Sequence, residues 1–197
     1  MSSPNDASGG EVIVHVFGRT DVGRTREHNE DAFAVADLTT GNATLQPEVR
    51  THPAGPKGTL FMVADGMGGA AAGEIASAMA VEVVVSELRS VWVTGESSGA
   101  EEFVRAIKQA TKAANERINS YASAHPEYRG MGTTATIAGL LGDTLYLAQV
   151  GDSRAYLVRK GKIYQVTKDQ SLVQQLIDAN QISPEEAETH TLKNTWL

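Results

Sequence analysis

The stretch that decides the fold is Phe61-Met62-Val63-Ala64-Asp65-Gly66-Met67-Gly68-Gly69, in which an apolar run ends on an acid and then on glycines. Residues 59–64 carry no charge, and their length predicts a buried strand with Asp65 at its C-terminal end. The glycines allow a sharp turn and close approach to a ligand. Asp65 and the carbonyl of Gly66 are therefore candidate ligands for a hard divalent cation. The simpler alternative is that Asp-Gly only makes a tight turn after the strand.

Length and composition narrow the function classes. The chain has 197 residues, a formal net charge of −7 and no cysteine. We expect one domain at 11–197 after a small, polar, disordered leader at 1–10. The acidic balance without a basic stripe argues against nucleic-acid or membrane partners, and the lack of cysteine excludes disulfides, thiolate zinc sites and a cysteine nucleophile. Because neither a secretory signal nor a membrane-length apolar run is present, a cytoplasmic protein is expected.

Hydrophobic periodicity predicts sheet strands first, then two long helices, then more strands. Strands are predicted at 11–19, 32–38, 59–64, 133–141, 144–150, 153–159 and 162–166. The last four are short and in meander order, which predicts antiparallel pairing. Helices are predicted at 70–92, 103–121 and 172–179, with a further helix from Pro184 because Ser183 precedes it as a cap. Residues 39–58 are rich in glycine and proline and are interpreted as a surface loop.

Three acidic points lie at predicted strand edges: the pair Glu30-Asp31, then Asp65, then Asp152. Consecutive strand residues point to opposite faces, so at most one of Glu30 and Asp31 can face a given site directly. The three points are far apart in the sequence. Only the fold can bring them together, and spacing alone does not show that it does.

Five motifs containing these acids resemble the metal-dependent serine/threonine protein phosphatases, the PP2C or PPM family, in their bacterial form. The motifs are 20–31 (Thr-Asp-Val-Gly through Arg-Glu-His-Asn-Glu-Asp), 63–69 (Val-Ala-Asp-Gly-Met-Gly-Gly), 130–135 (Gly-Met-Gly-Thr-Thr-Ala), 150–154 (Val-Gly-Asp-Ser-Arg) and 167–173 (Thr-Lys-Asp-Gln-Ser-Leu-Val). They occur in family order and cover nearly the whole chain after the leader. Each is weak alone, but together they are a specific signal.

The resemblance implies an α+β fold, a four-layer α-β-β-α sandwich of two antiparallel sheets flanked by helices. It also implies two Mn²⁺ or Mg²⁺ ions, with a third in bacterial members, that activate a water to attack phosphorus in line. Such a centre lowers the pKa of the water and stabilises the leaving oxygen without a protein nucleophile, in agreement with the missing cysteine. The implied partners are phosphorylated proteins, including a serine/threonine kinase or its substrates.

Residue by residue, the resemblance assigns metal ligands to this chain. Asp65 matches the bridging carboxylate and Gly66 the carbonyl ligand, whereas Glu30 and Asp31 match the acidic pair beside the metals. Asp152 matches a ligand of the third, weaker site. As a simpler alternative, Asp152 caps a turn between two strands.

Arg26 matches the arginine that binds the substrate phosphate, a role that suits its planar fork, although a surface arginine is the plainer alternative. Thr134 matches a threonine near the metal centre. Two positions depart from the family pattern: Met67 stands where animal members carry a histidine proposed as general acid, and Gln170 replaces a histidine common in bacterial members.

Family members continue for several tens of residues past the length of this chain, with an Asp-Gly and an Asp-Asn motif that complete the second metal site. We therefore expect a fragment that lacks its C-terminal strands and has little activity alone. The alternative is a non-catalytic phosphoprotein-binding or regulatory module with an incomplete metal centre. A third reading is a related phosphatase that acts on a partner-switching regulator of transcription, and the residues do not separate it from the first.

Overall fold

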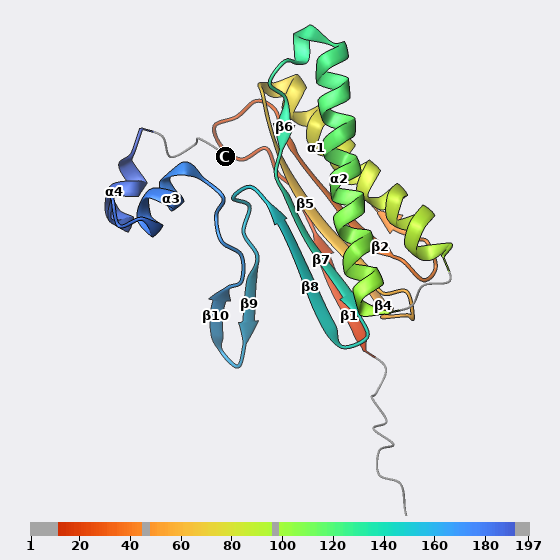
Figure 1. Ribbon diagram of the computed structural model, residues 1–197. Coiled ribbons are helices and arrows are strands. Elements are labelled where there is room, and N and C mark those ends of the chain that lie inside the picture. Colours follow the sequence, from red (N-terminus) through yellow and green to blue (C-terminus); the bar gives the residue numbers. More distant parts are fainter. Residues whose placement is uncertain (1–11, 45–47, 96–98, 192–197) are drawn as a thin grey trace, which may run out of the picture.

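Two long helices cover one face of a large antiparallel sheet (Figure 1). The computed structural model describes residues 12–44, 48–95 and 99–191. Helix α1 (Ala70–Leu88) continues into a π-helical turn (Arg89–Val93), and α2 (Ala100–Ala124) lies beside it and ends before a 3₁₀ turn (Pro126–Tyr128). The two predicted long helices are confirmed as one covering layer.

The sheet beneath the helices has the strand order β3-β2-β5-β7-β8, and β6 pairs with the end of β5. Its strands are β2 (Asp31–Asp37), β3 (Ala43–Thr44), β5 (Thr59–Met67), β6 (Gly132–Thr133), β7 (Ala135–Leu141) and β8 (Thr144–Val150). All neighbouring pairs are antiparallel. The strand containing Asp65 therefore lies inside the sheet, and it runs two residues beyond that acid.

The core lies between this sheet and the helices. Alternate residues of β5, including Leu60 and Met62, are buried on the face that α1 and α2 cover. Trp92 and Phe103 are also buried, with ring centroids 5.1 Å apart. Small residues make up the buried face of the N-terminal half of α1, among them Ala72, Ala76 and Ala80. Small side chains let the helix approach the sheet closely, which brings its first turn near the end of β5.

The predicted loop at 39–58 is wrong in part. It contains β3 and also β4 (Glu48–Pro53), which pairs with β1 (Ile13–Gly18) in a separate two-stranded sheet. Proline and glycine on both sides of β4 masked the strand. Pro53 is tolerated because it is the last residue of β4, at the edge of a two-stranded sheet, where the missing N–H costs little. The β1–β4 pair lies against the face of the large sheet opposite the helices, where Val16 and Phe17 share a cavity with Phe33.

The predicted four-strand meander is interrupted after β8. Strands β9 (Tyr156–Arg159) and β10 (Lys162–Gln165) pair with each other in a separate sheet rather than continuing the large one. The interruption falls at Gly151, whose φ of 93° turns the chain out of the ladder. The C-terminal segment then forms α3 (Leu172–Asp178) and α4 (Pro184–Thr189).

Helix α4 begins with the predicted capping box, in which Ser183 and Glu186 each bond the other's backbone N–H. None of the helices in the described ranges is long and apolar enough to cross a membrane. The predicted leader at 1–10 lies outside the described residues.

Candidate metal and phosphate site

Two of the predicted acids face each other across neighbouring strands. In the antiparallel pairing of β2 with β5, Asp31 is the direct partner of Asp65. Side chains at directly opposed positions project from the same face, with Cβ atoms about 4.5–5.5 Å apart. Because Ala64, next to Asp65, is buried toward the helices, the Asp65 side chain points to the other face. Two carboxylates from distant parts of the sequence thus lie side by side.

Glu30 occupies the opposite side of the strand from Asp31, as the alternation of side chains predicts. Its carboxylate fills the space where a Cβ on Gly73 of α1 would be. Its backbone carbonyl accepts a hydrogen bond from the N–H of Gly66 at 3.0 Å. Gly66 also has no room for a side chain, because a Cβ there would meet the backbone of Gly73. The Asp-Gly step is therefore packed between the start of β2 and the first turns of α1.

Thr134 fastens the end of β5 to the turn that carries Asp152. Its hydroxyl accepts from the N–H of Asp65 at 3.0 Å, and its own N–H donates to the carbonyl of Asp65 at 2.9 Å. The same hydroxyl is 2.7 Å from the hydroxyl of Ser153. Thr134 thus connects the strand end that carries Asp65 to the turn that carries Asp152, and its side chain is buried.

Burial and neighbouring acids raise the pKa values of Asp31 and Asp152, and nearby arginines offset this only in part. Partial burial raises the pKa of Asp31, and the neighbouring Asp65 carboxylate raises it further, while the Arg26 guanidinium acts in the opposite direction. Burial also raises the pKa of Asp152, with added repulsion from Asp169 and Asp65. Asp65 therefore acts electrostatically on both other acids, which puts all three in one neighbourhood.

A cavity of about 270 Å³ opens beside the Asp31–Asp65 pair. Besides these acids, its lining includes the arginines Arg19 and Arg154 and the hydroxyl residues Thr20 and Ser153. Arg26, the predicted phosphate ligand, is not among the lining residues; it lies on the exposed loop before β2, close enough to act on the charge of Asp31.

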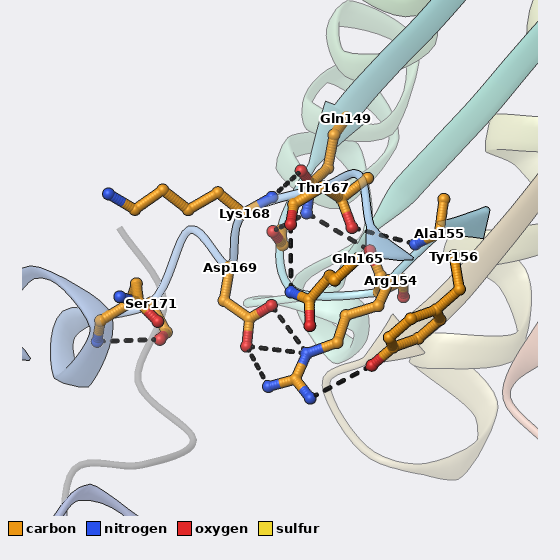
Figure 2. A network of polar contacts seen from close by, with 12 residues as sticks. Gln149, Arg154, Ala155, Tyr156, Gln165, Thr167, Lys168, Asp169 and Ser171 are labelled. Carbon is orange, nitrogen blue, oxygen red and sulfur yellow. Dashed lines mark hydrogen bonds and ion pairs between the residues drawn. The ribbon is translucent and has the colours of Figure 1, made fainter. Parts of the chain in front are cut away.

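Arg154 is, with Arg19, one of two arginines of this cavity to which the sequence assigned no role. Its guanidinium makes a bidentate pair with Asp169, with Nε–Oδ1 at 2.9 Å and Nη2–Oδ2 at 2.6 Å, and its Nη1 lies 3.5 Å from the Tyr156 hydroxyl (Figure 2). The pair joins the motif at 150–154 to the motif at 167–173. The occurrence of an arginine and an aspartate in those two motifs was the only available signal, and it did not reveal the contact.

The donor set fits a hard divalent cation only in part. Carboxylate oxygens are suitable ligands, and the repulsion between Asp31 and Asp65 is the kind that a cation relieves. Within residues 12–44, 48–95 and 99–191, however, no three histidine or acidic side chains are gathered closely enough to hold one ion. The structure thus brings two ligands together, keeps Asp152 within electrostatic reach and turns Glu30 toward α1.

The family of this α+β domain, with its paired acids on β2 and β5, is identified by comparison with known proteins. The protein phosphatase 2C profile matches residues 48–191. This chain belongs to the PP2C family.

Among curated proteins it is similar to the serine/threonine phosphatase stp of Listeria welshimeri, with 37% identity over 185 residues. That match covers 93% of this chain and 66% of the relative, so the chain spans just under two thirds of the relative's length.

Solved structures agree with this assignment. The crystal structure of the Mycobacterium tuberculosis serine/threonine phosphatase PstP/Ppp matches with a TM-score of 0.68 and 32% identity, over 94% of this chain and 66% of the other. The catalytic domain of PstP in complex with two manganese ions matches with a TM-score of 0.65 and 33% identity, over 89% and 65% of the two chains. The predicted PP2C-like α+β fold is confirmed.

Proposed function

We propose that this chain is the metal-dependent part of a phosphatase that hydrolyses phosphoserine and phosphothreonine in proteins. The observation that carries the proposal is the cross-strand pair Asp31–Asp65, which lies beside a cavity that also contains arginine side chains. Paired acids that suit a cation thereby lie in a cavity with cationic side chains, and Arg26 lies on the neighbouring loop before β2. The phosphorylated proteins would include a serine/threonine kinase or its substrates.

Asp65 and Asp31 would hold two Mn²⁺ or Mg²⁺ ions together with the carbonyl of Gly66. The Glu30 carboxylate, which faces α1, would act on them through a bound water. Asp152 would contribute to a third, weaker site. When bound, such cations supply an activated water and neutralise charge on the phosphoryl oxygens. The chain's own part is to fix the carboxylates, and the backbone bonds to Glu30 and Thr134 do this for the segment around Asp65.

Arg26 would orient the phosphate by its planar fork of N–H donors. Its exposed position on the loop before β2 allows it to swing toward a phosphate bound beside Asp31. Arg154 is already engaged by Asp169, and Arg19 by Asp21 at 2.5 Å. Arg26 therefore has the freedom that these two arginines lack.

A second candidate function is a phosphoprotein-binding module without catalysis. The observation in its favour is that no three acidic or histidine side chains in the described ranges converge on one point. Such a module would use the same arginines to bind phosphate, but it would have no need of the repulsion between Asp31 and Asp65. The direct cross-strand pairing of Asp31 with Asp65 therefore supports the enzyme over the module.

The test is hydrolysis of p-nitrophenyl phosphate and of a phosphothreonine peptide with excess Mn²⁺. We expect slow turnover that Asp65→Asn abolishes and that a chelator abolishes reversibly. Asp143→Asn is the matched control, because Asp143 is an exposed acid in the β7–β8 turn at the far end of the sheet. Activity that persists in excess chelator would refute the metal mechanism. Peptide binding without hydrolysis would favour the module instead.

A further inference from the structure

Two glutamine side chains enclose the turn that follows β8. The side-chain Oε1 of Gln170 accepts a hydrogen bond from the N–H of Gly151 at 3.0 Å, and its Nε2 donates to the carbonyl of Gln149 at 3.3 Å. The backbone N–H of Gln170 also donates to the carbonyl of Gly151 at 3.0 Å. Gln170 thus donates to and accepts from backbone groups of the turn. It belongs to the segment that leads into α3.

Gln149 binds the same turn from within β8. Its Nε2 donates to the carbonyls of Gly151 at 3.0 Å and Ser153 at 3.3 Å, and its Oε1 accepts from the N–H of Lys168 at 3.2 Å (Figure 2). Backbone groups on both sides of Asp152 are therefore satisfied by side-chain amides. An amide suits this position because it donates and accepts at once, which neither a carboxylate nor an ammonium group can do.

The far side of the turn is pressed against Thr134. Gly151 has a φ of 93°, and a Cβ on it would lie 2.7 Å from a methyl carbon of Thr134, so only glycine fits. The hydroxyl of Thr134 is in turn bonded to the N–H of Asp65. A continuous series of contacts therefore leads from the glutamine amides through Gly151 and Thr134 to the strand end that carries Asp65.

We propose that Gln149 and Gln170 are positioning residues that hold the turn bearing Asp152 against the strand end bearing Asp65. Their role is to fix the separation of the two carboxylates, which makes a shared cation environment at that edge of the site. The purpose of this positioning rests on the proposed function, whereas the positioning itself is a property of the metal-free protein. It also gives the segment at 167–171 a direct influence on the acids.

The test is Gln170→Met, which removes both hydrogen bonds of the Gln170 side-chain amide with little change in side-chain volume. Gln174→Met is the matched control, because its amide lies four residues further on in α3 and donates to Asp178 rather than to the turn. In metal-free protein we expect the rate of amide hydrogen exchange at Gly151 to rise about tenfold in Gln170→Met, with a smaller rise at Asp65. The reason is that each lost hydrogen bond raises the equilibrium constant for local opening by about a few-fold. The control should leave both rates unchanged.

Mn²⁺ titration by calorimetry provides the second readout. Gln170→Met should weaken, by about three- to tenfold, the binding step that Asp152→Asn removes, and it should add nothing in the Asp152→Asn background. Gln149→Met should behave in the same way. Unchanged exchange at Gly151 and Asp65, or faster exchange with an unchanged Mn²⁺ titration, would overturn the proposal. If the unsubstituted chain binds no Mn²⁺, the proposed function fails, and the exchange rates alone then support or overturn the positioning.

Discussion

Replacing Gly73 by alanine tests the position of the Glu30 carboxylate against α1. Where a helix has room, this exchange stabilises a protein by about 1 kcal/mol, because alanine has the higher helix propensity. Here the new Cβ would collide with the Glu30 carboxylate and lie 2.9 Å from the carbonyl carbon of Gly66. Overpacking of this kind costs about 1–3 kcal/mol. The collision cancels or outweighs the gain, so we expect Gly73→Ala to lower the free energy of unfolding by about 0–2 kcal/mol.

Urea denaturation followed by circular dichroism, in chelator, measures this difference. In a Glu30→Ala background the same exchange should cost at least about 1 kcal/mol less, since one of the two obstacles is gone. Ser86→Ala on the exposed face of α1 is the control and should leave stability equal or slightly higher. If Gly73→Ala stabilises the protein by the full propensity gain and is indifferent to Glu30→Ala, the carboxylate does not lie against the helix and our account of the strand start is wrong.

Two further predictions concern the acids and their link. Asp31 and Asp152 have folded-state pKa values above the ordinary 3.8, so the folded protein holds more protons than the unfolded chain, and metal-free stability should fall as pH rises from 3.8 through those raised values. Thermal unfolding in chelator checks this fall, and Asp31→Asn should make it shallower; an equal slope would contradict it. Thr134→Val should cost about 1–3 kcal/mol in urea unfolding, because the N–H of Asp65 loses its acceptor. Thr111→Val, on α2, should cost far less, and equal losses would disprove the link.

The sequence predicted those parts of the fold that depend on local pattern. The run before Asp65 is a strand because its alternate residues are buried against helices, and periodicity reveals this directly. The capping box of α4 was predictable for the same reason, since all its groups lie within four residues. Strand β4 was missed because the prolines and glycine around it are a local signal for a loop. What makes it a strand is its pairing with β1, which is distant in the sequence and leaves no local signal.

Contacts between distant segments were beyond the reach of pattern. That Asp31 lies opposite Asp65 follows from the register of β2 with β5, which is set by burial along the whole length of both strands. The resemblance gave both acids a shared role but did not supply this register. The ion pair of Arg154 with Asp169 was missed because no periodic signal connects a turn to a segment fifteen residues later.

The proximity of Asp31, Asp65 and Asp152 lowers the stability of the metal-free fold, and hydrogen bonds elsewhere in the site offset this loss. Burial and the repulsion with Asp65 raise the pKa of both Asp31 and Asp152, so the ionised forms of these acids destabilise the metal-free folded protein. The bonds of Thr134 and of the glutamine amides hold the acids in place despite this repulsion. A cation that binds only the folded state relieves the repulsion and stabilises the protein by mass action. The same charges that weaken the empty site therefore strengthen cation binding, and stability and Mn²⁺ affinity should change in opposite directions when any one of these carboxylates is neutralised.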